Sequence, residues 1–194
     1  MQEQQTPSHQ FVENDNLALP LASVGYFSTQ ECLEIVRVSE QHPQVAGVAG
    51  TRGDLTHLRD SRIASIPPNL ETQWIFQKIQ AAVFHANQLY RYELAGFREG
   101  LQVATYTNGG HYGWHLDIGK GSMSTRKLSV SVQLTDAQEY QGGDLEFFCL
   151  EDPNVPKSIG SVIIFPSFLP HRVAPVTSGT RKSLVAWIHG PSFR

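Results

Sequence analysis

The C-terminal half of the chain holds a series of short strand-like runs with no helical pattern between them, and this restricts the possible folds most strongly. After Gly96, apolar and β-branched residues gather in runs that Gly, Pro, Asn and Asp residues separate. Runs of this kind predict β-strands joined by turns. The predicted strands cover residues 101–107, 127–134, 144–150, 158–165 and 183–189.

The helical patterns lie before these strands. A Ser-x-x-Glu capping box at Ser28 and Glu31 predicts a helix over residues 29–42, and a long apolar stripe at helical spacing predicts a second helix over residues 71–92. Two short strands and a Gly-rich loop complete this half, at residues 23–27, 58–66 and 45–56. Helices followed by strands predict an α+β, mainly β fold, a β-sandwich or jelly roll with the helices packed on one outer face.

The composition is that of a globular protein, with 194 residues of which 40% are hydrophobic. We expect residues 1–16, which are polar and without periodicity, to form a flexible tail before a single domain at residues 17–194. The net charge of -3, without a Lys/Arg run, does not favour binding to nucleic acid. No apolar stretch approaches the ~18 residues of a membrane span, no signal-peptide core is present, and the two cysteines, Cys32 and Cys149, predict no disulfide framework. These features predict a cytoplasmic location, without a membrane or nucleic-acid partner.

One short stretch, residues 112–117, carries side chains suited to a metal ion. His115 and Asp117 are two residues apart, so in an extended strand both point to the same face. His171, which follows an apolar strand-like run, is the best candidate for a third ligand. Two histidines and one carboxylate match the facial triad of non-haem Fe(II) oxygenases, which leaves positions open for O2 and a co-substrate. His111 is an alternative ligand, although the glycines before it predict a turn there.

A positively charged residue follows at a position from which its side chain can extend to the predicted metal site. Arg181 lies ten residues after His171 and begins another apolar strand. Lys182, the next residue, should point to the opposite face of that strand.

These motifs together resemble the Fe(II)- and 2-oxoglutarate-dependent dioxygenases of the prolyl 4-hydroxylase-like branch. The resemblance covers roughly residues 94–188 and rests on Tyr106, residues 112–117, Gly142-Gly143-Asp144-Leu145, Phe165-Pro166-Ser167, His171-Arg172-Val173, Pro175-Val176 and Gly179-Thr180-Arg181. A fainter match lies upstream, where Arg59-Asp60-Ser61 is similar to an Arg-x-Ser strand that borders the substrate mouth in this branch. The resemblance implies a double-stranded β-helix, which is a jelly roll.

The same resemblance implies roles for individual residues. His115, Asp117 and His171 would be the iron ligands, and Arg181 would pair with the distal carboxylate of 2-oxoglutarate. The charge balance of the site supports the role of Arg181. Fe(II) carries two positive charges, whereas Asp117 and 2-oxoglutarate together carry three negative ones, so one negative charge remains. Burying that charge without a cation beside it would be costly. An arginine fork binds a carboxylate through two parallel bonds. Further contacts to the co-substrate are expected from Tyr106, Gln133 and Leu145.

Two of these contacts have alternatives. Tyr106 could equally be a buried core residue, and Gln133 stands where some relatives carry a tyrosine, so its amide would have to replace a phenol. Leu145 is expected to form an apolar wall. The loop at residues 118–126, which follows the metal-binding stretch, is a candidate lid.

The implied reaction is hydroxylation of an unactivated C–H bond with O2, with succinate and CO2 as co-products and ascorbate as a stimulating reductant. A prolyl residue in a peptide or protein is the favoured substrate, and a free amino acid or small metabolite is the alternative. The residues expected at the substrate mouth are Arg59, Arg62, Tyr112 and Trp114. Two other classes stay open, a cupin-like metalloprotein with Zn or Ni, and a catalytically silent jelly-roll binding module.

Overall fold

The structure is a computed structural model that describes residue 14 and residues 19–47, 58–148 and 155–192. It contains two α-helices, α1 (Thr29–Glu40) and α2 (Gln73–Tyr90), and a 3-10 helix, η1 (Gly121–Thr125). The strands are β1 (Leu21–Ser23), β2 (Gln44–Ala46), β3 (Arg59–Asp60), β4 (Arg62–Ile66), β5 (Leu101–Tyr106), β6 (His111–His115), β7 (Arg126–Gln133), β8 (Tyr140–Gly142), β9 (Leu145–Phe147), β10 (Val162–Pro166), β11 (His171–Val173), β12 (Val176–Gly179) and β13 (Arg181–His189).

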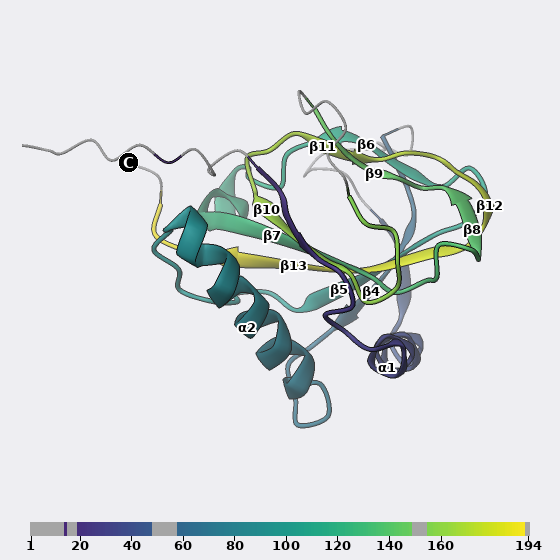
Figure 1. Ribbon diagram of the computed structural model, residues 1–194, viewed down its shortest axis with the longest axis horizontal. Helices are drawn as coiled ribbons and strands as arrows, with labels where there is room; N and C mark the ends of the chain where they lie inside the picture. The colour runs from purple at the N-terminus through teal and green to yellow at the C-terminus, as the bar shows by residue number, and fades with distance from the viewer. Residues whose placement is uncertain (1–13, 15–18, 48–57, 149–154, 193–194) are drawn as a thin grey trace, which may run out of the picture.

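The strands form a larger and a smaller antiparallel sheet that face each other (Figure 1). The larger sheet has the strand order β1-β10-β7-β13-β5-β4-β2, and the smaller has the order β3-β6-β11-β9. A third pair, β12 with β8, lies at one end. This arrangement confirms the predicted mainly β fold of the jelly-roll type.

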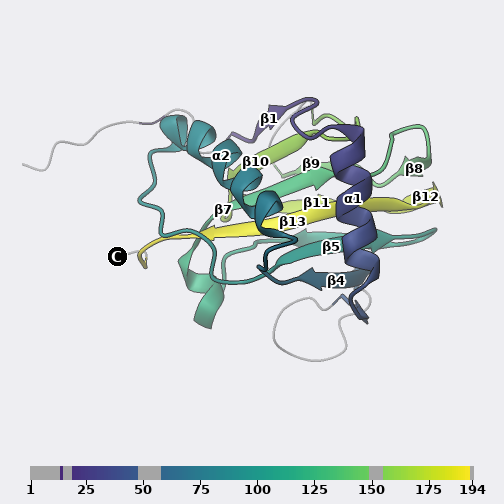
Figure 2. The same ribbon diagram turned by 90° about the horizontal axis from the view of Figure 1, so that it is seen from below.

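Both helices cover the outer face of the larger sheet (Figure 2). Strand alternation produces this layer, because Leu128, Val130 and Val132 on β7 belong to the apolar cluster that also contains the buried faces of α1 and α2. The intervening residues Ser129 and Ser131 point to the other face, toward the smaller sheet. The larger sheet therefore has one apolar face that holds the helices and one more polar face.

Helix α1 begins at the predicted capping box. The Ser28 hydroxyl accepts a hydrogen bond from the Glu31 N–H (3.3 Å), and the Glu31 carboxylate accepts one from the Ser28 N–H (2.7 Å). The Lys78 ammonium on α2 lies 2.6 Å from the same carboxylate, so the two helices are joined by an ion pair. Buried Cys32 on α1 is a free thiol.

Several strand boundaries differ from the sequence-based prediction. The segment 58–66 is two strands, because the chain leaves the smaller sheet after Asp60 and enters the larger one at Arg62. The strand predicted at 23–27 lies instead at Leu21–Ser23, where it pairs with β10. Strands β8, β11 and β12 have only three or four residues each, too few to show a period in the sequence.

The prediction of a loop over residues 45–56 was wrong at its start, where β2 pairs with β4 as a three-residue edge strand. The rest of that loop lies largely outside the described residues, as do the end of the predicted strand 144–150 and the predicted tail apart from Asn14. Within the described residues, neither helix combines the length and the apolar character that crossing a membrane requires.

Candidate metal centre

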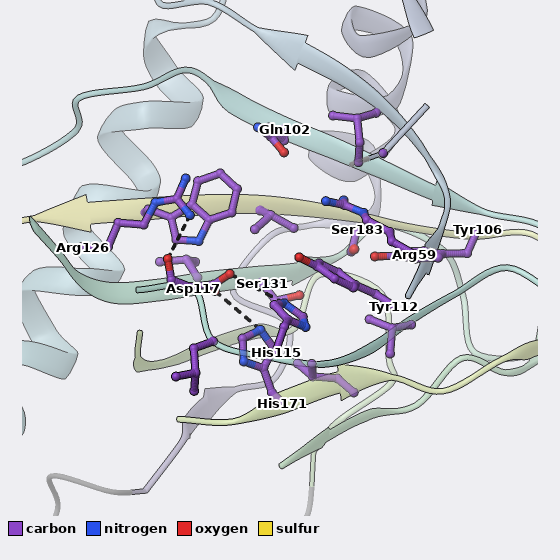
Figure 3. A pocket seen from close by; sticks show the side chains of 18 of the residues that line it. Arg59, Gln102, Tyr106, Tyr112, His115, Asp117, Arg126, Ser131, His171 and Ser183 are labelled. Carbon is purple, nitrogen blue, oxygen red and sulfur yellow. Dashed lines mark hydrogen bonds and ion pairs between the residues drawn. The ribbon is translucent and has the colours of Figure 1, made fainter. Parts of the chain in front are cut away.

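The two histidines and the carboxylate identified by their spacing meet at one point between the sheets (Figure 3). His115 at the end of β6 lies directly opposite His171 at the start of β11, and Asp117 follows β6 by two residues. The potential ligand atoms all lie within 4.8 Å of one another. Nε2 of His115 is 3.7 Å from Oδ1 of Asp117, and Nε2 of His171 is 3.5 Å from Oδ2.

Backbone contacts orient both imidazoles. Nδ1 of His115 lies 2.8 Å from the Gly113 carbonyl, and Nδ1 of His171 lies 2.9 Å from the Leu169 carbonyl. Because a carbonyl only accepts hydrogen bonds, each Nδ1 carries the proton and each Nε2 keeps a lone pair directed toward the carboxylate. Burial, assisted by the neighbouring His171, lowers the pKa of His115 to about 4. The ring is therefore uncharged at physiological pH, and the lone pair of its Nε2 can bind a metal ion.

Asp117 is held through both its backbone and its side chain although it lies beyond the end of β6. Its N–H donates to the Ser167 carbonyl (3.0 Å), and its Oδ2 accepts from the Ser129 hydroxyl (2.6 Å). Burial alone would raise the pKa of Asp117, but His171, His115 and the Ser129 bond hold that pKa below its usual value. The carboxylate is therefore charged, and its supporting residue Ser129 was not identified from the sequence. A serine on the polar face of an otherwise apolar strand was the signal that could have shown it.

A pocket of about 550 Å³ opens from this centre toward Arg181. Several residues expected in the site line it, namely His115, Asp117, His171, Arg181, Tyr106, Leu145, Arg59 and Tyr112. It is also lined by residues that the sequence analysis did not single out, among them Gln102, Ser131, Ser183, Arg126 and Trp187. His111, the alternative ligand, is not part of the converging group.

A β-bulge decides which aromatic side chains of β6 face the pocket. The partners of His171 and Val173 on β6 are His115 and Tyr112, so the strand has one extra residue between them. Tyr112 and His115 therefore share the pocket face, where their rings stack with centroids 3.5 Å apart. The guanidinium of Arg59 lies 4.4 Å from the centre of the Tyr112 ring, on the pocket rim.

Trp114 lies on the outer face of the smaller sheet, because it is adjacent to the inward-facing His115. Its indole packs against Arg172 (4.8 Å to the ring centre) and against the Phe148 ring (5.4 Å between centroids). Trp114 does not line the pocket, and neither does Arg62, which is exposed next to inward-facing Ile63 on β4. These two residues of the predicted substrate mouth therefore lie outside the pocket lining, and a role for them in substrate binding stays a prediction.

Arg181 is a buried cation at the far end of the pocket. It is 1% exposed, and its guanidinium donates to the Gln133 side-chain oxygen (3.1 Å) and to the Ser183 hydroxyl (3.3 Å). Within the described parts of the chain, no carboxylate forms an ion pair with it and its Nε has no hydrogen-bond partner. A buried charge without a counterion is unfavourable, so this end of the pocket fits an anionic group. Lys182 points to the other face, as predicted, and pairs with Glu40 on α1 (2.9 Å).

The glycine pair before Leu145 makes room for this arginine. Gly143 has a φ of +62°, and a Cβ there would lie 2.9 Å from Cδ of Arg181.

Gly143→Ala is expected to lower the free energy of unfolding by about 1–3 kcal/mol and to weaken anion binding at Arg181, because strain and a steric clash act together. Urea unfolding with 2-oxoglutarate titration measures both effects. Gly109→Ala is the control, since Gly109 has a φ of +84° with nothing within 4 Å of its added Cβ. An equal loss in both variants would mean that strain alone operates.

The predicted lid loop lies beside the centre. Ile118 and Met123 line the pocket, and η1 occupies most of the loop. The Ile118 N–H donates to the Ser167 carbonyl (3.1 Å). Closure of this loop over a ligand stays a prediction.

Comparison with known proteins finds matches in the family that the motifs resemble. The model of the family described as the 2OG-Fe(II) oxygenase superfamily matches residues 101–189. A PKHD-type hydroxylase of Synechococcus sp. (strain CC9902) is 37% identical over 81 residues, which are 41% of this chain and 36% of the relative. One of Hyphomonas neptunium is 42% identical over 87 residues, 41% of this chain and 38% of the relative. The matched segments thus span well under half the length of these relatives.

Solved structures show the same fold over most of the chain. A prolyl-4-hydroxylase of Pseudomonas putida superposes with a TM-score of 0.72 at 20% identity and covers 92% of this chain and 97% of its own. A prolyl hydroxylase of Trichoplax adhaerens, solved with a hypoxia inducible factor peptide fragment, gives a TM-score of 0.72 at 18% identity, with 90% and 84% covered. Fe(II) and 2-oxoglutarate, the cofactors predicted from the resemblance, agree with the family description and with the triad. Residues 101–189 of this chain thus match the 2OG-Fe(II) oxygenase superfamily, and the chain has the fold of a prolyl-4-hydroxylase.

Proposed function

We propose that this chain is a hydroxylase that depends on Fe(II) and 2-oxoglutarate. The observation that supports it most directly is the pairing, in one pocket, of a His-Asp-His group with a buried arginine that lacks a counterion among the described residues. The first provides three ligands on one face of a metal ion, and the second suits the distal carboxylate of a dicarboxylic co-substrate.

In this proposal His115, Asp117 and His171 hold the iron, and Arg181 binds the distal carboxylate of 2-oxoglutarate. When bound, iron with 2-oxoglutarate and O2 supplies the oxidising chemistry that hydroxylates a C–H bond and leaves succinate and CO2. The protein positions the reactants. The Gln133 amide and the Ser183 hydroxyl hold the guanidinium fork in place, and Leu145 and Tyr106 line the pocket.

For the substrate we propose a prolyl residue in a peptide or protein. Two structurally similar enzymes carry prolyl hydroxylase in their names, and one was solved with a peptide fragment. Arg59 and Tyr112 lie stacked in the pocket wall, where an aromatic ring beside a cation can receive an apolar pyrrolidine ring next to polar peptide groups. A free amino acid would use the same surfaces without the flanking peptide.

The test is succinate formation by the Fe(II)-loaded protein with 2-oxoglutarate, alone and with prolyl peptides or free amino acids. We expect slow iron-dependent turnover without substrate, faster turnover with prolyl peptides, and loss of both in His115→Ala. His111→Ala is the matched control, since His111 lies on the same strand outside the converging group.

Two results would contradict parts of this proposal. Bound iron without any succinate would favour the cupin-like alternative. Stimulation by free amino acids but not by peptides would leave the reaction class intact and overturn the proposed substrate.

A further inference from the structure

An arginine beside the candidate metal centre connects Asp117 to two residues that are distant in the sequence. Arg126, at the start of β7, donates from Nη1 to the backbone carbonyl of Asp117 (3.1 Å; Figure 3). Its other two nitrogens donate to Glu99, at 2.9 Å and 2.7 Å. Its guanidinium lies 3.8 Å from the centre of the Trp187 ring. All five donors of an arginine fork are fixed in one plane, so these contacts define its position.

Glu99 is in turn held by a buried histidine. Nε2 of His189 lies 3.1 Å from Oε1 of Glu99, and Nδ1 of His189 lies 2.9 Å from the Thr125 hydroxyl. His189 is 1% exposed and lies opposite Arg126 in the pairing of β13 with β7. Four segments therefore meet around one guanidinium, namely the start of β7, the end of β13, the end of η1 and the segment before β5.

Asp117 has a particular need for such support. It lies beyond the last residue of β6, so no strand ladder fixes its peptide group. Its N–H bonds to Ser167 and its carboxylate to Ser129, while its carbonyl accepts from Arg126. Groups that orient a metal ligand from behind contribute to metal affinity without touching the metal.

We propose that Arg126 is a positioning residue that fixes the backbone of Asp117 for metal binding, and that Glu99 and His189 hold Arg126 in that position. The inference rests on the proposed metal site and assigns to it three residues outside the triad. Glu99 is the accessible end of the group, since its side chain is 31% exposed against 10% for Arg126.

The chain contains a closely matched control pair. Arg172 also pairs with a glutamate, Glu146 (2.7 Å), and also lies over a tryptophan, Trp114 (4.8 Å). It is even adjacent in sequence to a triad residue, His171. The difference is that the Arg172 pair lies on the outer face of the smaller sheet, away from the pocket.

The experiment measures Mn(II) binding to the metal-free 194-residue chain by calorimetric titration, together with its melting temperature. Arg126→Gln is expected to weaken Mn(II) binding about 10-fold. Glu99→Gln, a change at a partly exposed position that should fold normally, is expected to weaken Mn(II) binding by a smaller factor. Arg172→Gln and Glu146→Gln should leave Mn(II) affinity unchanged.

The outcomes separate the possible failures. Arg126→Gln and Glu99→Gln with wild-type Mn(II) affinity, even at a lower melting temperature, would assign the group a structural role only and overturn the positioning role. Equal weakening in the Arg172 pair would also overturn it, because the effect would then be general. If the wild-type chain binds no Mn(II), the metal site itself fails and the positioning role fails with it. If Arg126→Gln does not fold, Glu99→Gln decides the question.

Discussion

Asp117→Ala is expected to reduce Mn(II) or Fe(II) affinity by more than about 100-fold and to abolish succinate formation. The carboxylate is the only negatively charged member of the converging group, and both histidines lie within 4 Å of it through Nε2. Loss of a residue that merely supports a ligand costs about 10- to 100-fold in metal affinity, so loss of the anionic ligand should cost more. Titration of the metal-free protein and the succinate assay measure the two effects.

The fold should survive this substitution, which keeps the test interpretable. The backbone N–H of Asp117 donates to Ser167 and its backbone carbonyl accepts from Arg126, and both contacts remain when the side chain is changed. Asp117→Asn, which keeps the shape and removes the charge, should show nearly the same loss of metal binding. Asp144→Ala is the control, because Asp144 is a carboxylate of the Gly142-Gly143-Asp144 run that pairs only with Lys157 among the ion pairs of the described residues. Unchanged metal affinity in Asp117→Ala would place the metal elsewhere.

Arg181→Ala is expected to weaken 2-oxoglutarate binding by at least about 30-fold while metal binding stays near the wild-type level. Removal of one partner from a buried, hydrogen-bonded charge pair costs about 2–5 kcal/mol, and the guanidinium is almost fully enclosed. The measurement is titration of 2-oxoglutarate into the Mn(II)-loaded protein without O2.

Two further variants sharpen this result. Arg181→Lys keeps the charge but not the fork, so it should restore part of the affinity. Lys182→Ala removes the adjacent cation from the opposite face, where it pairs with Glu40, and should leave 2-oxoglutarate binding unchanged. Equal 2-oxoglutarate affinity in Arg181→Ala and the wild type would remove the assigned role of Arg181.

The triad could be predicted from sequence because its spacing reflects local geometry. His115 and Asp117 are close in the chain, and His171 follows a short apolar run that forms the buried strand β10. The alternation on β13 likewise separates Arg181 from Lys182. These features depend on the period of a strand, which the sequence carries directly.

Other parts of the site depend on irregularities that no period predicts. The bulge in β6 brings Tyr112 to the pocket face beside His115, although strict alternation from His115 would place Tyr112 on the outer face with Trp114. Glu99, Arg126 and His189 meet only because the ends of β7 and β13 pair, so their sequence positions show no relation to one another. The split of the 58–66 segment arises in the same way, from a change of sheet at Ser61.

The two ends of the pocket come from different layers of the jelly roll. The histidines stand on the smaller sheet, whereas Arg181 and Gln133 stand on the larger one. A molecule that chelates the metal with one end and contacts Arg181 with the other would bind to both sheets at once and hold them together. A ligand that binds only the folded state stabilises it by a free energy that rises with the logarithm of its concentration relative to its Kd. We therefore expect the two layers to be held together least tightly when the pocket is empty, which is also the state in which a molecule has to enter it.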